Sequence, residues 1–132
     1  MSNVTAQLNN FRQAPRKMRM VVSAVRGKKV SEALVNLEFM AKKASLPIRN
    51  LIKSAVANAR DLQMPTENLV VKKITVDSGK ILYRRRPAAR GSAHPIRKRT
   101  SRIFVELSEN PSLKFVKSKV HKVNSKSTLK TL

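Results

Sequence analysis

Hydrophobic and polar residues alternate at the start of the chain and then change to a helical period. The alternation predicts a half-buried strand over residues 2–9, with one face formed by Val4, Ala6 and Leu8. A helical stripe follows, in which positions i, i+3, i+4 and i+7 are Met18, Val21, Val22 and Val25. Pro15 fits the first position of this helix, and Gly27 fits the position just past its end.

Two further helices are predicted by the same period. The first is short and carries its apolar stripe at Val30, Ala33, Leu34 and Leu37. The second has the strongest helical pattern of the chain, formed by Ile48, Leu51, Ile52, Ala55, Val56 and Ala59. Pro47 belongs in its first turn, where a missing N–H is tolerated.

Two β-rich runs follow the helices. Residues 69–86 lack clean alternation at their start, which permits a bulge, whereas residues 101–109 alternate regularly. Between the runs, Pro87, Gly91 and Pro95 indicate a turn, so the runs should form a hairpin. The chain is therefore predicted to be an α+β protein with three helices packed on a small three-stranded antiparallel sheet and a long protruding β-hairpin. We expect one domain over residues 1–109, with the hairpin arm at about 80–102, and a basic lysine-rich C-terminal extension over residues 110–132.

Charge narrows the possible functions. The 132 residues include 29 Lys+Arg and only 7 Asp+Glu, for a formal net charge of +22, which would destabilise a compact monomer by self-repulsion. Eight arginine or lysine residues and no acid lie between Tyr83 and Arg102. A polyanion is the natural neutraliser, with nucleic acid as the first candidate and an anionic membrane surface as the second.

Other classes of function lack the residues that they require. Without cysteine there is no disulfide or thiolate metal site. The acids form no paired-carboxylate motif and the three glycines form no phosphate-binding loop, so we expect no catalytic residue, no metal and no cofactor. The N-terminus does not resemble a signal peptide and no apolar run approaches the roughly 18 residues of a membrane span, so an intracellular protein with no membrane partner is expected.

The candidate RNA-binding residues form two groups. Arginine predominates in the hairpin, where its planar fork can hold phosphate oxygens in pairs, and a second basic group surrounds the first helix. A solvated helix face is the alternative for that second group, but two basic surfaces favour a protein enclosed by a large folded RNA. Aromatic residues make up only 4%, which disfavours recognition by base stacking. The predicted RNA-binding residues are Arg12, Arg16, Lys17, Arg19, Arg26, Lys28, Arg84, Arg85, Arg86, Arg97, Lys98, Arg99 and Arg102.

Four motifs in order resemble a known family. They are P-R-K-x-R at residues 15–19, R-G-K at 26–28 with A-L downstream, S-A-x-A-N-A at 54–59, and P-x-A-R-G-x-A followed by I-x-K-R-T-S at 87–101. Over about Val4 to Glu109 the chain resembles the large-subunit ribosomal protein twenty-two family of bacterial type. The resemblance implies a structural constituent of the large ribosomal subunit, located in the cytoplasm or in an organelle, that binds large-subunit rRNA and supports subunit assembly.

The resemblance also implies further partners. The hairpin tip would line the nascent-peptide exit tunnel and face the nascent polypeptide, and neighbouring large-subunit ribosomal proteins would be in contact. The tip residues are Pro87, Ala88, Ala89, Arg90, Gly91, Ser92, Ala93 and His94. The chain departs from the family at Ala14, where serine is frequent, at Ala88 and Ser92, where arginine is common, and at Arg102, where histidine is frequent.

Two alternatives belong to other classes. An architectural DNA-binding protein could use the basic β-arm to insert Pro87 or Pro95 between base steps, and it would be a dimer with paired arms. A membrane-surface or antimicrobial protein would need larger apolar faces on its basic helices.

Overall fold

A computed structural model of the chain describes residues 3–109, and the predicted extension over 110–132 lies outside the described residues. The elements follow one another as β1 (Asn3–Phe11), α1 (Pro15–Val25), α2 (Val30–Phe39), α3 (Ser45–Asp61), the 3₁₀ turn η1 (Thr66–Asn68), β2 (Leu69–Ser78), β3 (Leu82–Pro87), the 3₁₀ turn η2 (Ala89–Gly91), β4 (Ala93–Lys98) and β5 (Ser101–Glu109). The α+β class, the three helices and the antiparallel sheets are confirmed.

The three-stranded sheet has the order β1-β5-β2, and both pairings are antiparallel. The predicted bulge lies in β2, where the register with β5 shifts between Val71 and Lys73. An extra residue reverses which face the following side chains take. As a result Val71 before the bulge and Ile74 after it are both buried, although they are three residues apart.

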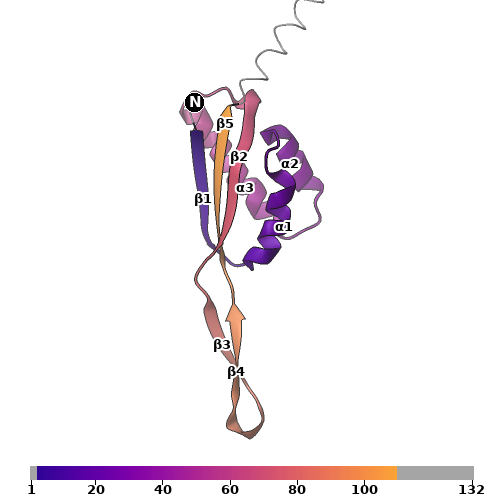
Figure 1. Cartoon of the computed structure of the whole chain (residues 1–132), viewed down its shortest axis with the longest axis vertical. Coiled ribbons are helices and arrows are strands. Elements are labelled where there is room, and N and C mark those ends of the chain that lie inside the picture. Colours follow the sequence, from indigo (N-terminus) through magenta and orange to yellow (C-terminus); the bar gives the residue numbers. More distant parts are fainter. Residues whose placement is uncertain (1–2, 110–132) are drawn as a thin grey trace, which may run out of the picture.

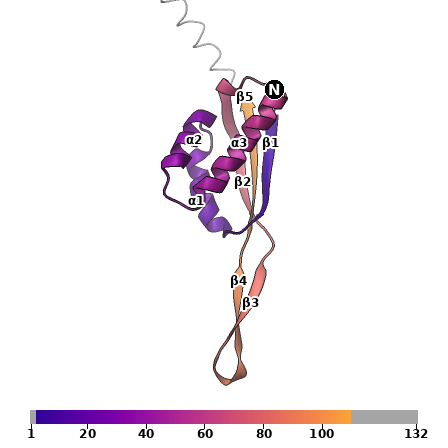
Figure 2. The same cartoon turned by 180° about the vertical axis from the view of Figure 1, so that it is seen from behind.

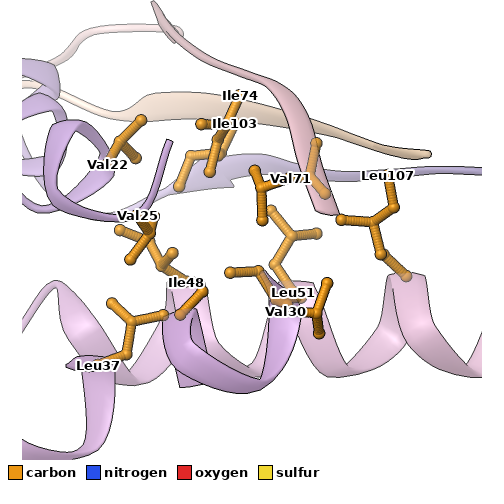
Figure 3. Close-up of a cluster of buried hydrophobic side chains, with 14 of the residues drawn as sticks. Val22, Val25, Val30, Leu37, Ile48, Leu51, Val71, Ile74, Ile103 and Leu107 are labelled. Carbon is orange, nitrogen blue, oxygen red and sulfur yellow. The ribbon is translucent and has the colours of Figure 1, made fainter. Parts of the chain in front are cut away.

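The helices cover one face of this sheet (Figures 1 and 2). Helix α3 lies across β1 and β5, and α1 lies against β2. Figure 3 shows Val22 and Val25 of α1, Leu37 of α2 and Ile48 of α3 in one cluster that also contains Ile103 of β5. All of these side chains are buried, and each large one contributes roughly 1.5–3 kcal/mol relative to an exposed position.

The ends of α1 agree with the predicted capping residues. Pro15 is the first helical residue, and Gly27 follows the helix with a φ of +74°, a conformation that glycine adopts without strain. The Gly27 N–H then donates to Val71 O at 3.0 Å, and the Val71 N–H donates to Lys28 O at 3.0 Å. The connection between α1 and α2 therefore covers part of the exposed edge of β2.

The hairpin is a separate two-stranded sheet that extends away from the helices (Figures 1 and 2). The first β-rich run is divided between Ser78 and Leu82 into β2 and β3. The second run, residues 101–109, is β5, and the additional strand β4 forms within the segment predicted as a turn. Thr100 and Ser101 are buried. Arg102 consequently lies on β5 opposite Asp77 rather than on the protruding arm. Within residues 3–109, none of the helices has the length and apolar character that crossing a membrane requires.

Candidate nucleic-acid interface

The arm, residues 82–98, has no core of its own. Strands β3 and β4 pair from Leu82 with Lys98 to Pro87 with Ala93, and every side chain of both strands is exposed. An isolated two-stranded hairpin is marginal in water. The shape of the arm therefore depends on its attachment to the domain and on whatever surrounds it.

Arginine side chains occupy both faces of the arm. Residues directly opposite one another in an antiparallel pair share a face, and successive residues alternate. Arg84 and Arg86 accordingly lie on one face, while Arg85 and Arg97 lie on the other. Such an arm can be contacted by a polyanion from two sides.

The tip turns through two left-handed residues. Arg90 has φ 57° and ψ 34°, and Gly91 has φ 73°. The turn is closed by the Ala88 N–H, which donates to Ser92 O at 2.8 Å, and by the Ser92 hydroxyl, which donates to Ala89 O at 2.9 Å. Arg90 is the single arginine or lysine among residues 87–94, so the predicted tip carries little charge compared with the strands.

The arm joins the domain at a tightly packed neck, which we define as residues 79, 80, 99 and 100. The Gly79 N–H donates to Thr100 O at 3.0 Å, and the Thr100 hydroxyl donates to Lys80 O at 2.6 Å. A Cβ at Gly79 would lie 2.5 Å from Thr100 Oγ1, so any larger residue there would displace the Thr100 side chain. Arg12 Nη1 adds a bond to Arg99 O at 3.3 Å, which ties the segment after β1 to the arm.

The predicted RNA-binding cations around α1 differ in their contacts, because two of them bond to the protein itself. Arg19 Nε donates to Val76 O at 3.1 Å, and Arg26 Nη2 donates to Ile74 O at 3.0 Å, so both reach the edge strand β2. These two arginines therefore support the fold as well as adding charge, and their side chains remain exposed.

Folding brings some predicted residues together and adds two that sequence reasoning missed. Arg12 and Lys17 line a hollow at the base of the arm with residues 97–99. Lys42 and Lys43, in the connection between α2 and α3, line the same hollow. A lysine doublet between two helices was the only sequence signal for this pair, and it does not distinguish a binding residue from ordinary surface charge.

The arm contains no acidic residue of its own. No aspartate or glutamate lies between Ser78 and Val105. Glu32, Glu38 and Glu106 instead pair within the domain, at N···O distances of 4.0, 3.3 and 3.1 Å, with Lys29, Arg49 and Lys72. In the described part of the chain, no group of three or more His, Cys, Asp or Glu residues could hold a metal ion.

The sequence matches the family model described as ribosomal protein L22p/L17e over residues 6–108. It is 46% identical over 109 residues to the large ribosomal subunit protein uL22 of Latilactobacillus sakei subsp. sakei, covering 82% of this chain and 93% of the relative. The uL22 protein of Herpetosiphon aurantiacus is 50% identical over 101 residues, covering 76% and 89%. The uL22 protein of Desulfitobacterium hafniense is 46% identical over 110 residues, covering 83% and 96%.

The matched region includes all three helices, the arm and most of the sheet. This agrees with the resemblance seen in the motifs, and it confirms the prediction of a structural protein rather than an enzyme. The chain therefore belongs to the ribosomal protein L22p/L17e family.

Proposed function

We propose that this ribosomal protein, a structural constituent of the large ribosomal subunit, binds large-subunit rRNA through its arm and through the basic residues at the base of the arm. One observation carries the proposal. The arm projects from the domain, exposes arginine on both faces and contains no acid. An arm of this composition is suited to lie within folded RNA, with phosphate on more than one side.

The base of the arm extends the proposed interface. Arg12 is bonded to Arg99 O, so the cations around α1 are held next to those of β4. The apolar stripes of the three helices face the core, which leaves their polar faces for RNA rather than for insertion into a membrane. Arg16, Lys17 and Lys28 are exposed and complete the contact surface.

The tip is proposed to line the nascent-peptide exit tunnel. Its small residues and low charge are suited to a narrow passage for polypeptide, where a row of arginines would hold acidic segments. The chain would act in the cytoplasm as part of the ribosome, beside neighbouring large-subunit proteins. Residues 1–109 would form the rRNA-binding domain, with residues 110–132 as a basic extension.

Filter binding of the full chain to large-subunit rRNA tests the main proposal, with small-subunit rRNA as competitor. Replacing Arg97, Lys98 and Arg99 with alanine should weaken binding and reduce the slope of log affinity against log salt by about 1 for each phosphate that is no longer neutralised. The matched control replaces three exposed cations on α3 and β2, Lys53, Arg60 and Lys73, which removes the same charge.

The two triple variants distinguish a defined interface from general charge attraction. Equal loss of affinity in both would contradict an interface on the arm. Equal affinity of the unmodified chain for both rRNAs, or for DNA of the same length, would contradict the proposed partner.

Deletion of residues 88–94 tests the role of the tip. Subunits that contain the shortened arm should sediment normally on sucrose gradients, while the passage of nascent chains that stall in the tunnel should change. An assembly defect as large as that of the Arg97–Arg99 variant would place the tip in RNA rather than at the tunnel wall.

A further inference from the structure

A hollow of about 920 Å³ lies where the arm meets the domain. Its walls come from four segments that are distant in sequence: residues 12–14 after β1, α1, the connection between α2 and α3, and residues 97–99. Figures 1 and 2 show the beginning of α1 next to the point where the arm leaves the sheet. Sites for small molecules and cofactors typically measure roughly 300–1,000 Å³, so this neck cavity is large enough for a ligand.

The lining of the neck cavity has two parts. Seven of its thirteen residues are cationic and none is acidic, and the cations are Arg12, Lys17, Lys42, Lys43, Arg97, Lys98 and Arg99. The apolar part includes Met20, Val21 and Met40. Met20 is 65% exposed, whereas Met18, two residues earlier on the same helix, is fully buried. A ligand that matches both parts must combine negative charge with an apolar part.

Hydrogen bonds connect two of the walls to the rest of the domain. Arg12 Nη1 donates to Arg99 O across the arm side. At the connection between α2 and α3, the Ser45 hydroxyl shares its single proton between Lys42 O at 2.6 Å and Met40 O at 3.0 Å. The connection that carries Met40 and the two lysines is therefore held to the start of α3, and the arm side of the cavity is attached through Arg12.

We propose that the neck cavity receives one unpaired nucleotide of RNA, with its base against Met20 and Met40 and its phosphate among the surrounding cations. This inference rests on the proposed function. Contact with backbone phosphates alone would require the cations but not the methionines. A thioether packs favourably against an aromatic ring, and a guanidinium such as that of Arg12 can stack on a base. The cavity thus supplies apolar contact for a base in a protein with few aromatic residues.

Methionine methyl groups provide the assay. The full chain, labelled with ¹³C at the methionine methyls, is titrated with each of the four nucleoside 5′-monophosphates and, separately, with ribose 5-phosphate and inorganic phosphate. We expect saturable upfield shifts of the Met20 and Met40 methyls with at least one nucleotide, because the ring current of a stacked base acts on them. Met18 and Met64 are buried and do not line the cavity, so they serve as internal controls.

Each alternative outcome of the titration overturns the inference. Equal shifts with ribose 5-phosphate or inorganic phosphate would mean that the cavity holds an anion and no base. Shifts that are absent, or that are spread equally over Met18 and Met64, would mean that no nucleotide enters.

A substitution then connects the cavity to RNA. Met20→Ser should weaken nucleotide binding roughly two- to tenfold and weaken binding to large-subunit rRNA without changing its salt dependence, because an apolar contact releases no counterions. The matched control is Leu62→Ser, which changes an apolar residue that is 64% exposed at the end of α3. If the unmodified chain prefers large-subunit rRNA and the Met20→Ser variant binds it equally well, only the nucleotide site is overturned. If the unmodified chain shows no preference for large-subunit rRNA, the proposed function itself is overturned.

Discussion

The close packing of Gly79 against Thr100 allows a quantitative test of how the arm is attached. Replacing Gly79 with alanine puts a Cβ 2.5 Å from Thr100 Oγ1. Thr100 is only 4% exposed, so its side chain has little room to move away. Rotation of the Thr100 side chain, which would move Oγ1 away from the added Cβ, would break the 2.6 Å bond from the hydroxyl to Lys80 O. Either response destabilises the neck.

The expected magnitude follows from three contributions. Overpacking at a buried contact costs about 1–3 kcal/mol, and loss of the hydroxyl bond costs about 0.5–1.5 kcal/mol. The smaller conformational freedom of alanine in the unfolded chain offsets about 0.4–1 kcal/mol. Gly79→Ala should therefore lower the free energy of unfolding by roughly 0.5–4 kcal/mol, with a central value of about 2 kcal/mol.

The double variant gives a sharper result than either single change. Thr100→Ala removes Oγ1, and the nearest remaining Thr100 atoms, the backbone C and Cβ, lie 3.4 Å from the added Cβ, which is close to ordinary contact. Once Thr100 is alanine, Gly79→Ala should cause almost no further loss. The two changes should thus be non-additive by about 2 kcal/mol.

Urea unfolding followed by circular dichroism of the helices measures these free energies, in enough salt to screen the net charge. Gly91→Ala is the control, because Gly91 has a left-handed φ but open space around its Cβ position. The loss of unfolding free energy caused by Gly91→Ala should simply add to the loss caused by Thr100→Ala. Additive costs for Gly79 and Thr100 would refute the close contact, and no cost in any variant would show that the neck unfolds independently of the domain.

Three further predictions concern α1. Ala14→Ser supplies the side-chain cap that the helix lacks, so it should raise the free energy of unfolding by about 0.5–2 kcal/mol and the urea midpoint with it. An unchanged midpoint would contradict the placement of the helix start at Pro15. Met18→Ala should lower the free energy of unfolding by about 2–5 kcal/mol, because Met18 is buried, whereas Met20→Ala at an exposed position should lower it by less than about 0.5 kcal/mol. Equal losses would contradict the orientation of the helix. Arg26→Met should cost about 1 kcal/mol by removing the bond to Ile74 O, and a more stable variant would refute a supporting role.

Local patterns were sufficient to predict the helices and most of the sheet. The stripe from Met18 to Val25 is buried as its period indicates, and Pro15 and Gly27 mark the ends of that helix. These features depend on residues within a few positions of one another, so the sequence alone contains them. The excess of positive charge is also a property of composition, and it indicates a polyanionic partner whatever the fold of the chain.

The base of the arm could not be predicted in this way. The residues that meet there, from Arg12 to Arg99, are brought together by the pairing of β5 with both β1 and β2. The same pairing buries Thr100 and Ser101 and places Arg102 on the domain, although the sequence groups all three with the arm. Local spacing in the chain does not specify contacts between residues as distant in sequence as Arg12 and Arg99. Local patterns in the chain thus specify the helices, most of the strands and their buried faces, and they indicate a polyanionic partner. Contacts between distant segments instead set where the arm begins and which arginines bond to the protein itself, and they bring Lys42 and Lys43 into a cavity with two methionines.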